Sequence, residues 1–340
     1  MPEGRGSYES AGVSIERGER AVDLIRAAVE RTHGPEVIGA AGGFAGLYAL
    51  AGMRDPVLAS TIDGIGTKVL VAREMGRYDA LGADIVNHCA NDVLATGARP
   101  LFFLDYVGTG RLDPEAVAAL VRGAAEACRG LGIAVIGGET AEMPGLYGEG
   151  DFDVVGVCTG ACERGDVVTG EEVRPGDAVI GLASSGLHTN GYTLARKVVE
   201  DAGLSYDDAP GPLGRSVGEA YLVPHWTYVR EIQALREDVA VRGMAHVTGG
   251  GLVGNLPRAL GGLGAELDAG SWSEPEVFGL IRSLGNVREE EMRRVFNLGV
   301  GFCAVVAPED AERSLQSLRT SGCEAWRIGT VTERPGVRFA

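Results

Sequence analysis

The chain has 340 residues, more than one hydrophobic core usually serves, so we expect two domains. Its 45% hydrophobic and 23% charged residues are typical of a soluble globular protein. A formal net charge of −16 argues against nucleic acid or an anionic membrane as the main partner.

The first ten residues have no apolar core of the kind found in signal peptides, and no apolar run is long enough to span a bilayer. The six cysteines are dispersed and form no CxxC pair. Cys158 and Cys162 share one face of a predicted strand, where apolar packing is the simplest role. We therefore expect a reduced, cytoplasmic protein.

The hydrophobic pattern predicts alternating helices and strands along the whole chain. In the first half we expect helices over 17–33, 79–97 and 113–130, and strands over 56–62, 101–107, 133–136 and 152–161. In the second half we expect strands over 178–183, 241–247 and 302–307, and helices from about 190, over 224–236, from 251 and over 308–321. The polar segment 163–176 separates them and predicts two domains, 1–168 and 169–340. The fold class is α/β, or mixed α+β.

Glycine is unusually frequent, with 53 residues that cluster at strand ends and helix starts. Such clusters allow the backbone to approach a ligand closely, so they predict an active site built on loops. The chain has no G-x-x-x-x-G-K-[ST] loop and no G-x-G-x-x-G after a strand, so any nucleotide site belongs to neither common kind.

Lys68 and Lys197 are the only lysines among 31 basic residues, and each follows a polar, glycine-containing segment. In Asp63-Gly-Ile-Gly-Thr-Lys68 a carboxylate at a strand end is followed by free backbone amides, a hydroxyl and a cation. These are the groups that Mg²⁺ and a polyphosphate require. A plain glycine turn explains this segment equally well.

Two further polar segments in the first half carry carboxylates. Asn91 and Asp92 lie on the predicted helix 79–97 among apolar neighbours, which favours a site, whereas we expect His88 on a solvated face. Glu139 and Thr140 follow the apolar strand 133–136, where α/β sheets commonly place ligand groups. Asp63, Asp92 and Glu139 together would form an oxygen-rich cation site.

Three glycine-rich segments of the second half predict an anion site. Ser185, His188 and Asn190 precede a helix whose N-terminus could bind an anion, and Lys197 lies seven residues beyond Asn190. Each pattern is weak alone, and His246 taken by itself is expected to be a hydrogen-bonded core histidine. Together the segments favour an anionic substrate held by side chains and glycines at His246, Thr248, Gly249, Gly250 and Asn297.

The ordered segments DGIGTK, CANDVLATGARPLFFLDY, GGETAEMPGLY, SSGLHTNGYTLARK, HVTGGG, PEVF and FNLGVG resemble the phosphoribosylformylglycinamidine cyclo-ligase (AIR synthetase) family over nearly the whole chain. The resemblance implies ATP-dependent ring closure of formylglycinamidine ribonucleotide to aminoimidazole ribonucleotide, through an imidophosphate, in purine biosynthesis. It implies ATP and Mg²⁺ as cofactors, with K⁺ as a further candidate. It also implies a homodimer in which the N-terminal domains of two subunits form a β-barrel.

The resemblance also assigns residues. It implies Mg²⁺ ligands at Asp63, Asp92 and Glu139, and catalysis by charge and positioning through Asp63, Lys68 and His188. Nucleotide contacts are implied at Gly42, Gly43, Phe44, Asp63, Gly64, Thr67, Lys68, Asn91, Asp92, Glu139 and Thr140. Ribonucleotide contacts are implied at Ser185, His188, Asn190, Lys197, His246, Thr248, Gly249, Gly250 and Asn297. His88 departs from the family, which often has methionine there.

Related enzyme classes fit less well. A selenophosphate synthetase should have an N-terminal cysteine closely followed by lysine, but the first cysteine here is Cys89. A thiamine-monophosphate kinase needs an aspartate-rich pattern where this chain has His246-Val-Thr-Gly. A large formylglycinamidine ribonucleotide synthetase would be several times longer, and a hydrogenase-maturation protein should end in cysteine. A non-catalytic scaffold has little reason to keep the acidic positions.

Overall fold

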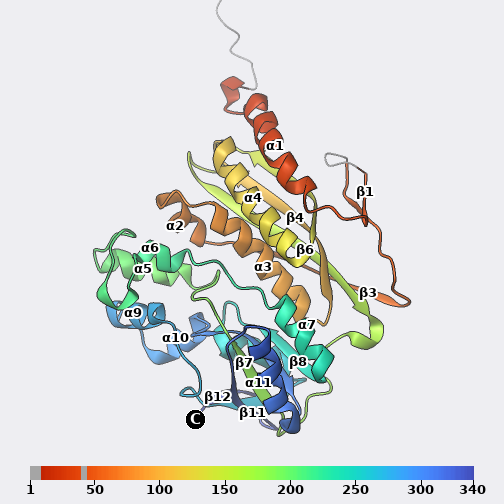
Figure 1. The fold of residues 1–340 in the computed structure, drawn as a ribbon. Helices are drawn as coiled ribbons and strands as arrows, with labels where there is room; N and C mark the ends of the chain where they lie inside the picture. The colour runs from red at the N-terminus through yellow and green to blue at the C-terminus, as the bar shows by residue number, and fades with distance from the viewer. Residues whose placement is uncertain (1–8, 40–43) are drawn as a thin grey trace, which may run out of the picture.

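The computed structural model describes residues 9–39 and 44–340, which form a four-stranded sheet, a six-stranded sheet and a small two-stranded ribbon. Figure 1 shows the four-stranded sheet with α1, α3 and α4 in one half of the molecule and the six-stranded sheet in the other. The predicted mixed α/β fold with two domains is confirmed.

The first domain is an open sheet with strand order β3-β6-β4-β5. Its strands are β3 (Pro56–Gly64), β4 (Arg99–Thr109), β5 (Ala134–Glu142) and β6 (Phe152–Glu163). Its helices are α1 (Ile15–Glu30), α2 (Lys68–Glu74), α3 (Asp79–Ala95) and α4 (Pro114–Leu131). The ribbon pairs β1 (Val37–Ile38) with β2 (Leu47–Tyr48).

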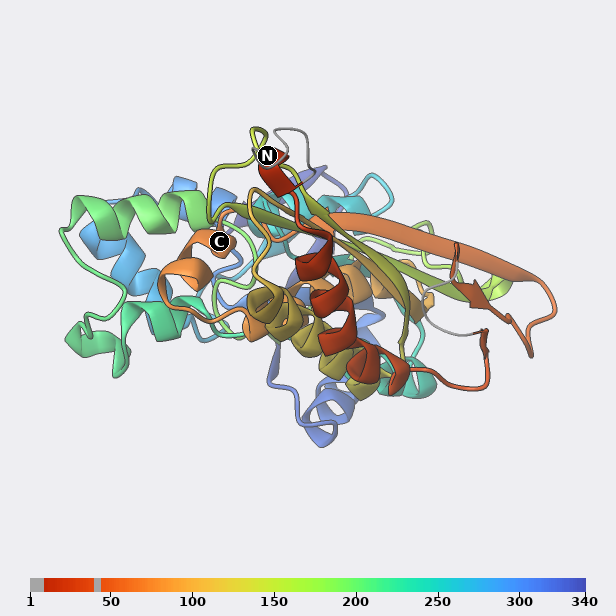
Figure 2. The same ribbon diagram turned by 90° about the horizontal axis from the view of Figure 1, so that it is seen from above.

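One face of this sheet is covered by helices and the other is not. Along β4 the alternate residues Leu101, Phe103 and Val107 are buried, whereas Phe102 and Leu104 between them stay partly exposed. Helix α3 packs on β6 and β3, α4 packs on α3, and α1 packs on α4 (Figure 2). In the described part of the chain the sheet does not close into a barrel, so the dimeric barrel stays a prediction.

The start of α4 shows how the sequence specifies an element. Asp113 Oδ1 accepts hydrogen bonds from the backbone N–H groups of Glu115 and Ala116, and Pro114 occupies the first helical position. Gly132 ends the helix with φ 69°, a conformation that glycine adopts at little cost. The helix expected over 113–130 is therefore confirmed as α4.

The second domain is a mostly antiparallel sheet with strand order β12-β9-β11-β7-β10-β8. Its strands are β7 (Ala178–Ala183), β8 (Val241–His246), β9 (Gly264–Leu267), β10 (Val300–Val306), β11 (Ala325–Thr332) and β12 (Gly336–Phe339). Its helices are α5 (Tyr192–Asp201), α6 (Val217–Tyr221), α7 (Val229–Asp238), α8 (Gly251–Asn255), α9 (Glu276–Leu284), α10 (Glu289–Val295) and α11 (Ala311–Thr320). Short 3₁₀ helices lie at Glu9–Ala11, Arg164–Asp166, Gly211–Leu213, Leu256–Ala259 and Pro308–Asp310.

Helix α3 joins the two domains, because it contacts β3 and β6 on one side and β8 and α7 on the other. A helix buried on several sides has little solvated face, so polar residues along it meet other protein groups. Among residues 9–39 and 44–340, no helix has the length and apolar character needed to cross a membrane.

Two element predictions were wrong. The helix expected over 224–236 begins only at Val229, because side chains of α3 hold the preceding segment in an irregular conformation: Asp84 Oδ1 accepts from His225 N, and Asn91 Oδ1 accepts from Tyr228 N. The strand expected over 133–136 is too short, since β5 continues to Glu142 in parallel pairing with β4.

Candidate active site

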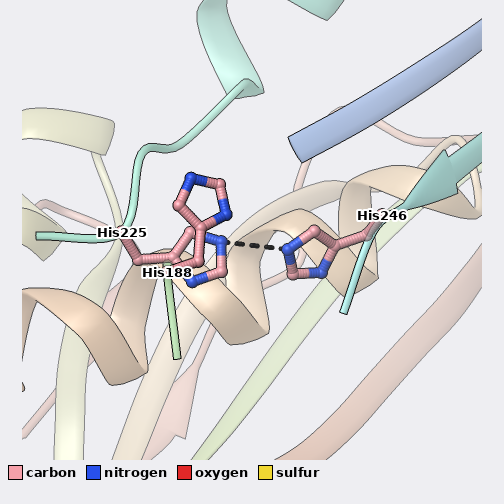
Figure 3. A group of neighbouring side chains, drawn as sticks. All are labelled: His188, His225 and His246. Atoms are coloured by element: carbon pink, nitrogen blue, oxygen red, sulfur yellow. Dashed lines mark hydrogen bonds between the residues drawn. The ribbon is translucent and has the colours of Figure 1, made fainter. Parts of the chain in front are cut away.

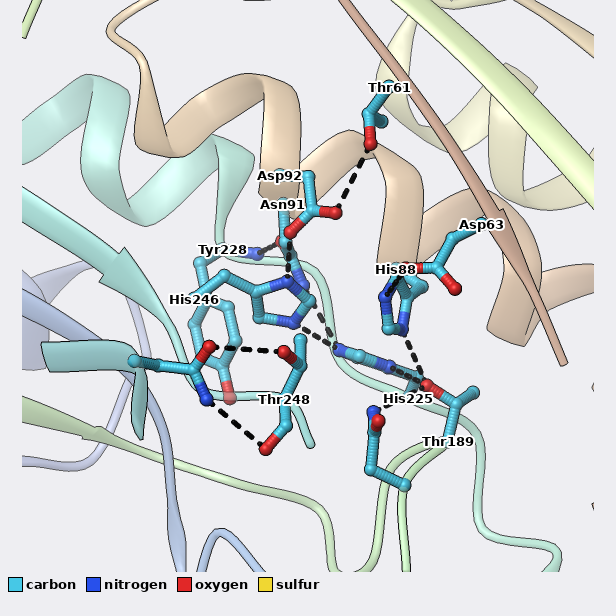
Figure 4. Close-up of polar contacts among 12 residues, drawn as sticks. Thr61, Asp63, His88, Asn91, Asp92, Thr189, His225, Tyr228, His246 and Thr248 are labelled. Atoms are coloured by element: carbon cyan, nitrogen blue, oxygen red, sulfur yellow. Dashed lines mark hydrogen bonds and ion pairs between the residues drawn. The ribbon is translucent and has the colours of Figure 1, made fainter. Parts of the chain in front are cut away.

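Four of the five histidines of the chain meet where α3 faces the second domain. They come from four segments: α3, the loop after β7, the segment before α7 and the end of β8 (Figures 3 and 4). All four are buried, with at most 5% of their surface exposed: His88, His188, His225 and His246.

A continuous chain of polar contacts crosses this cluster and joins two carboxylates (Figure 4). Its five contacts are Asp63 Oδ2 to His88 Nε2 (2.7 Å), His88 Nδ1 to Thr189 Oγ1 (2.6 Å), Thr189 Oγ1 to His225 Nδ1 (3.3 Å), His225 Nε2 to His246 Nε2 (3.0 Å) and His246 Nδ1 to Asp92 Oδ1 (2.8 Å). The histidines therefore orient Asp63 and Asp92, the two carboxylates that the sequence predicted at the site.

Both carboxylates are ionised at neutral pH. Burial alone would raise the pKa of Asp63, but its hydrogen bond and charge interaction with His88 outweigh burial and lower the pKa. The pKa of Asp92 is lowered in the same way, since His246 and Thr61 offset the burial. The side chains of Asp63 and Asp92 are 42% and 29% exposed, so each can still receive a ligand.

The histidines divide by the direction in which their pKa values are shifted. Burial lowers the pKa of His188 and of His225 well below the usual value, and it also lowers the pKa of His246. Burial would lower the pKa of His88 too, but the hydrogen bond and charge of Asp63, with Asp92 and Asp84 nearby, raise it overall. The carboxylate of Asp63 thus holds the pKa of His88 above its ordinary value, whereas the pKa values of the three other rings lie below it.

His88 contradicts the expectation of a solvated position, because it is only 2% exposed. Its ring lies between Asp63 and Thr189, so it has polar partners from both domains. His246 is a hydrogen-bonded buried histidine, as expected. His225 was missed: one histidine in a segment predicted to be helical shows no pattern, and only the fold brings it beside the others.

Lys68 does not face a ligand. Its ammonium lies 2.7 Å from Asp84 Oδ2 and donates hydrogen bonds to the carbonyls of His188 and Val223, and the residue is 0% exposed. Burial lowers the pKa of Lys68 and raises that of Asp84, while each partner's charge opposes the shift. This placement contradicts the predicted phosphate contact, because every donor direction of Nζ points at protein oxygens.

Glu139 and Thr140 lie away from the other predicted ligands. Asp63 is on the edge strand β3, and β6 and β4 separate it from Gly138 on the opposite edge strand β5. Three strand spacings amount to about 14 Å, too far for one metal ion. Within one chain the predicted ligand set Asp63, Asp92 and Glu139 is therefore wrong. Glu139 and Thr140 instead line a cavity of about 520 Å³ beneath α1.

Three other predicted contact residues serve the protein itself. Lys197 pairs with Asp201 at 2.9 Å on the exposed side of α5. Asn91 is fully buried and binds the backbone of Trp226 and Tyr228. Asn297 is 4% exposed and shapes its loop through Ser184 Oγ, Gly186 O and Gly299 N. Their side chains are not free for a ligand in this structure, contrary to the prediction.

The loop after β7 carries predicted substrate residues in a constrained conformation. His188 has φ 60°, rare for a residue with a side chain, and its Nε2 accepts from Ser185 N at 3.2 Å. Ser185 Oγ donates to the carbonyl of Pro224, and Asn190 Nδ2 donates to Thr189 Oγ1. Strain of this kind is concentrated at functional sites.

The glycine triplet before α8 forms the facing loop. Asn255 Nδ2 donates to the carbonyls of Thr248, Gly249 and Gly251, which holds the loop open towards solvent at Gly249. Gly250 has φ 103°, which residues with side chains rarely adopt. This loop presents backbone groups, as an anion site requires.

The remaining nucleotide residues lie near the end of β3 or outside the described residues. Gly64 N donates to Asp63 Oδ1, and Thr67 Oγ1 contacts Thr193 Oγ1 at 3.1 Å. Phe44 is fully exposed. Gly42 and Gly43 fall in 40–43, beyond the part of the chain that is described.

A cleft of about 410 Å³ opens between the two domains beside Asp92. It is lined by β3 and α3 on one side and by β8 and the 250–260 region on the other, including Thr61, Asp92, His246, Asn255 and Arg258. Arg258 was not predicted, since an arginine in an arginine-rich chain carries no signal. Its guanidinium contacts Asn255 Oδ1 at 3.3 Å and offers a cation opposite the carboxylate.

The oxygen donors fit Mg²⁺, the cofactor that the resemblance implies. Asp63 and Asp92 are ionised and partly exposed, and each gives one oxygen to a histidine. The other oxygen accepts from Gly64 N in Asp63 and from Thr61 Oγ1 in Asp92, and keeps a lone pair for a cation. Mg²⁺ is usually bound by one or two carboxylates with water and phosphate oxygens. Asp63 and Asp92 suffice for that without Glu139.

Comparisons with known proteins agree with this architecture. Residues 45–162 match the N-terminal domain model of AIR synthase related proteins, and residues 174–340 match the C-terminal one. The phosphoribosylformylglycinamidine cyclo-ligase of Sorangium cellulosum is 50% identical over 98% of this chain and 97% of its own length.

Solved structures share the fold at low identity. The thiamine-monophosphate kinase from Stenotrophomonas maltophilia superposes with TM-score 0.71 at 18% identity, covering 94% of this chain and 95% of its own. The hydrogenase maturation protein HypE in complex with ATP gives TM-score 0.68 at 18% identity, covering 95% and 91%. The identity to the cyclo-ligase and both domain matches decide the family: the chain belongs to the phosphoribosylformylglycinamidine cyclo-ligases, ligases of purine biosynthesis.

Proposed function

We propose that this protein uses ATP to close the imidazole ring of formylglycinamidine ribonucleotide. The formyl amide oxygen attacks the γ-phosphorus of ATP and releases ADP, and the neighbouring amine nitrogen then attacks the activated carbon and expels phosphate. The product is aminoimidazole ribonucleotide. The observation that carries the proposal is the pair of ionised carboxylates that the histidines orient: Asp92 lines the interdomain cleft, and Asp63 lies at the other end of the same chain of polar contacts.

ATP use has two supports. The fold is shared with a HypE structure solved with ATP, and the carboxylates suit a Mg²⁺-bound polyphosphate. Asp63 and Asp92 would hold Mg²⁺, which when bound neutralises charge on the transferred phosphoryl group. Arg258 supplies a positive charge from the opposite wall of the cleft.

The histidines act as positioning residues for the carboxylates. His88 fixes one oxygen of Asp63 and His246 fixes one oxygen of Asp92, so the remaining oxygens keep one direction. Ordered donors and acceptors lower the reorganisation needed during phosphoryl transfer. Ser185, His188, Asn190, Thr248, Gly249 and Gly250 would hold the ribonucleotide from the second domain.

We further propose a homodimer formed by the uncovered face of the four-stranded sheet. Leu58 and Ile62 on β3 are 62% and 68% exposed, and Phe102, Leu104 and Tyr106 on β4 are partly exposed on the uncovered sheet face. Exposed apolar surface of this kind marks an interface. In such a dimer Glu139 and Thr140 on edge strand β5 would reach the nucleotide site of the second copy.

Substrate-dependent ADP release tests the proposed activity. Purified protein with ATP, Mg²⁺ and formylglycinamidine ribonucleotide, with and without K⁺, should release ADP and form aminoimidazole ribonucleotide in equal amounts. Thiamine monophosphate serves as the matched control substrate, because a thiamine-monophosphate kinase shares the fold. Turnover of the control with none of the ribonucleotide contradicts the proposal.

A further inference from the structure

We propose that His225 and His246, together with His188, form a binding site for one transition-metal cation of the zinc class. This site uses ring nitrogens and differs from the carboxylate oxygens proposed for Mg²⁺. It does not depend on the proposed ring closure, because its test measures metal binding by the protein alone and needs no substrate.

The three rings offer nitrogen atoms that all lie within 4.8 Å of one another (Figure 3). The Nε2 atoms of His225 and His246 are only 3.0 Å apart. Two nitrogens bound to one tetrahedral zinc at 2.0–2.1 Å lie about 3.3 Å apart, so this pair needs only a small opening. All three residues are at most 5% exposed, which shields a bound ion from water.

The tautomer of His225 follows from its neighbours. Asn91 Oδ1 accepts from Tyr228 N and Asn91 Nδ2 donates to Trp226 O, so the amide orientation is determined. Asn91 Nδ2 also lies 3.2 Å from His225 Nε2 and donates to it. In the neutral ring His225 Nε2 therefore carries a lone pair, and the proton sits on Nδ1, facing Thr189 Oγ1.

The tautomer of His246 follows from Asp92. The carboxylate only accepts, so His246 Nδ1 carries the proton and donates to Asp92 Oδ1 at 2.8 Å. In the neutral ring the Nε2 atom of His246 then also carries a lone pair. Two lone pairs facing each other at 3.0 Å repel unless a cation lies between them. A metal ion, or one additional proton, removes that repulsion.

The outer partners match those of metal-bound histidines. A ligating imidazole usually donates its second N–H to a carboxylate or another oxygen, which fixes the ring and increases its basicity. His246 has Asp92 in this role and His225 has Thr189, itself held by His88 at 2.6 Å.

His188 supplies the third ligand. Because its Nε2 accepts from Ser185 N, the neutral ring carries its proton on Nδ1, and this buried N–H has no hydrogen-bond partner among the described residues, an unusual state for a buried polar atom. The ligand nitrogen is therefore Nε2. The ring is stacked on His225 with centroids 3.9 Å apart. Stacked rings do not point their lone pairs at one ion, so metal binding rotates His188 and breaks its 3.2 Å contact with Ser185 N.

The test uses untagged protein with Mg²⁺ in excess, so that the carboxylates are already occupied. Titration with Zn²⁺ against a chromogenic chelator should give one ion per chain, and Co²⁺ should give the intense visible bands of a tetrahedral nitrogen site. Zn²⁺ should also raise the thermal midpoint, because it binds the folded state.

Matched variants identify the ligands. His225→Gln and His246→Gln should each weaken Zn²⁺ binding at least tenfold, whereas His33→Gln should not, since His33 lies apart from the cluster and contacts Val135 O. Asp63→Asn should bind Zn²⁺ like the parent chain. Circular dichroism shows whether each variant folds. If one of them does not fold, His188→Gln is used in its place, and the measurement is the shift in thermal midpoint that Zn²⁺ produces.

Three results would overturn the proposal. One is equal Zn²⁺ affinity in the parent chain and in folded His225→Gln. A second is loss of binding in Asp63→Asn alone, which would place the ion on the carboxylates. The third is the absence of tetrahedral Co²⁺ bands, which would leave the extra proton as the cation of the histidine pair.

Discussion

Helix α3 carries two acidic residues eight positions apart that serve different purposes. Asp84 is fully buried against Lys68, with both side chains 0% exposed. Asp92 pairs with His246 but keeps 29% of its side chain exposed on the cleft. A fully buried charge pair can only hold the domains together, whereas a carboxylate that stays partly exposed can also bind a ligand. Exposure, more than charge, separates structural from functional groups here.

The largest expected effect comes from breaking the sealed pair. Lys68→Met leaves Asp84 as an unpaired buried charge, which should lower the free energy of unfolding by about 3–5 kcal/mol. Urea denaturation followed by circular dichroism measures the change. The double variant Lys68→Met/Asp84→Leu should recover much of the loss. Wild-type stability of Lys68→Met would contradict the structural role of the pair.

The open carboxylate should behave in the opposite way. Asp92→Asn removes a charge that we propose for Mg²⁺·ATP, so kcat/KM should fall by about a hundredfold or more, while the thermal midpoint changes little. Asp201→Asn, at the exposed pair with Lys197, is the control and should keep full activity. Parallel loss of activity and stability in Asp92→Asn would make Asp92 structural.

The histidine cluster predicts a pH dependence of stability. Burial lowers the pKa values of His188, His225 and His246, so these residues stay neutral in the folded chain at a pH where they take up protons in the unfolded chain. Their contribution to the free energy of unfolding is therefore fully present above the ordinary pKa of 6.5 and is lost as the pH falls below it. His88 has a raised pKa and acts oppositely, favouring the folded state below 6.5.

The three histidines with lowered pKa values outweigh His88, so the free energy of unfolding should decrease as the pH falls from 7.5 to 5.5. The decrease is up to about 1.4 kcal/mol per pH unit for each proton that the unfolded chain binds in excess of the folded chain. Urea denaturation at the two pH values tests this. The slope should become smaller in His225→Asn and larger in His88→Asn. The prediction fails if the parent chain is more stable at pH 5.5.

The smallest effect is expected at the other lysine. Lys197 is exposed and its pair with Asp201 is solvent-screened, so Lys197→Met should leave the thermal midpoint and the KM for ribonucleotide unchanged. A raised KM would show that Lys197 reaches the substrate and would restore its predicted role. Lys197→Met and Lys68→Met make the same substitution at an exposed and at a buried lysine, so the difference between their thermal midpoints measures the effect of burial.

Much of the fold was predictable because it depends on local patterns. The strand over 178–183 matches β7, and the helix over 79–97 differs from α3 by two residues, since apolar periodicity and glycine ends are local signals. The short strand β9 and the helices α9 and α10 were not predicted. Their segments are short, and tertiary packing determines their conformation.

The site was predicted in part for a similar reason. Asp63, Asp92 and the loops at His188 and Gly249 stand out as polar groups among glycines or apolar residues. His225 and Arg258 do not, because the ring partners of His225 lie 21 to 134 residues away along the chain and Arg258 faces a cleft that only the fold forms. Distance in sequence conceals a contact that no local pattern encodes.

The sequence by itself determined the family and the two-domain α/β architecture, and it predicted the two carboxylates as site residues, because ordered motifs and hydrophobic periodicity are local properties of the chain. Only the tertiary structure decided which charges face solvent. It sealed Lys68 against Asp84, placed Glu139 on the far edge of the sheet and gathered four histidines between two carboxylates. The physical reason is that burial and pairing set the charge state of a group, and both are properties of the packed fold.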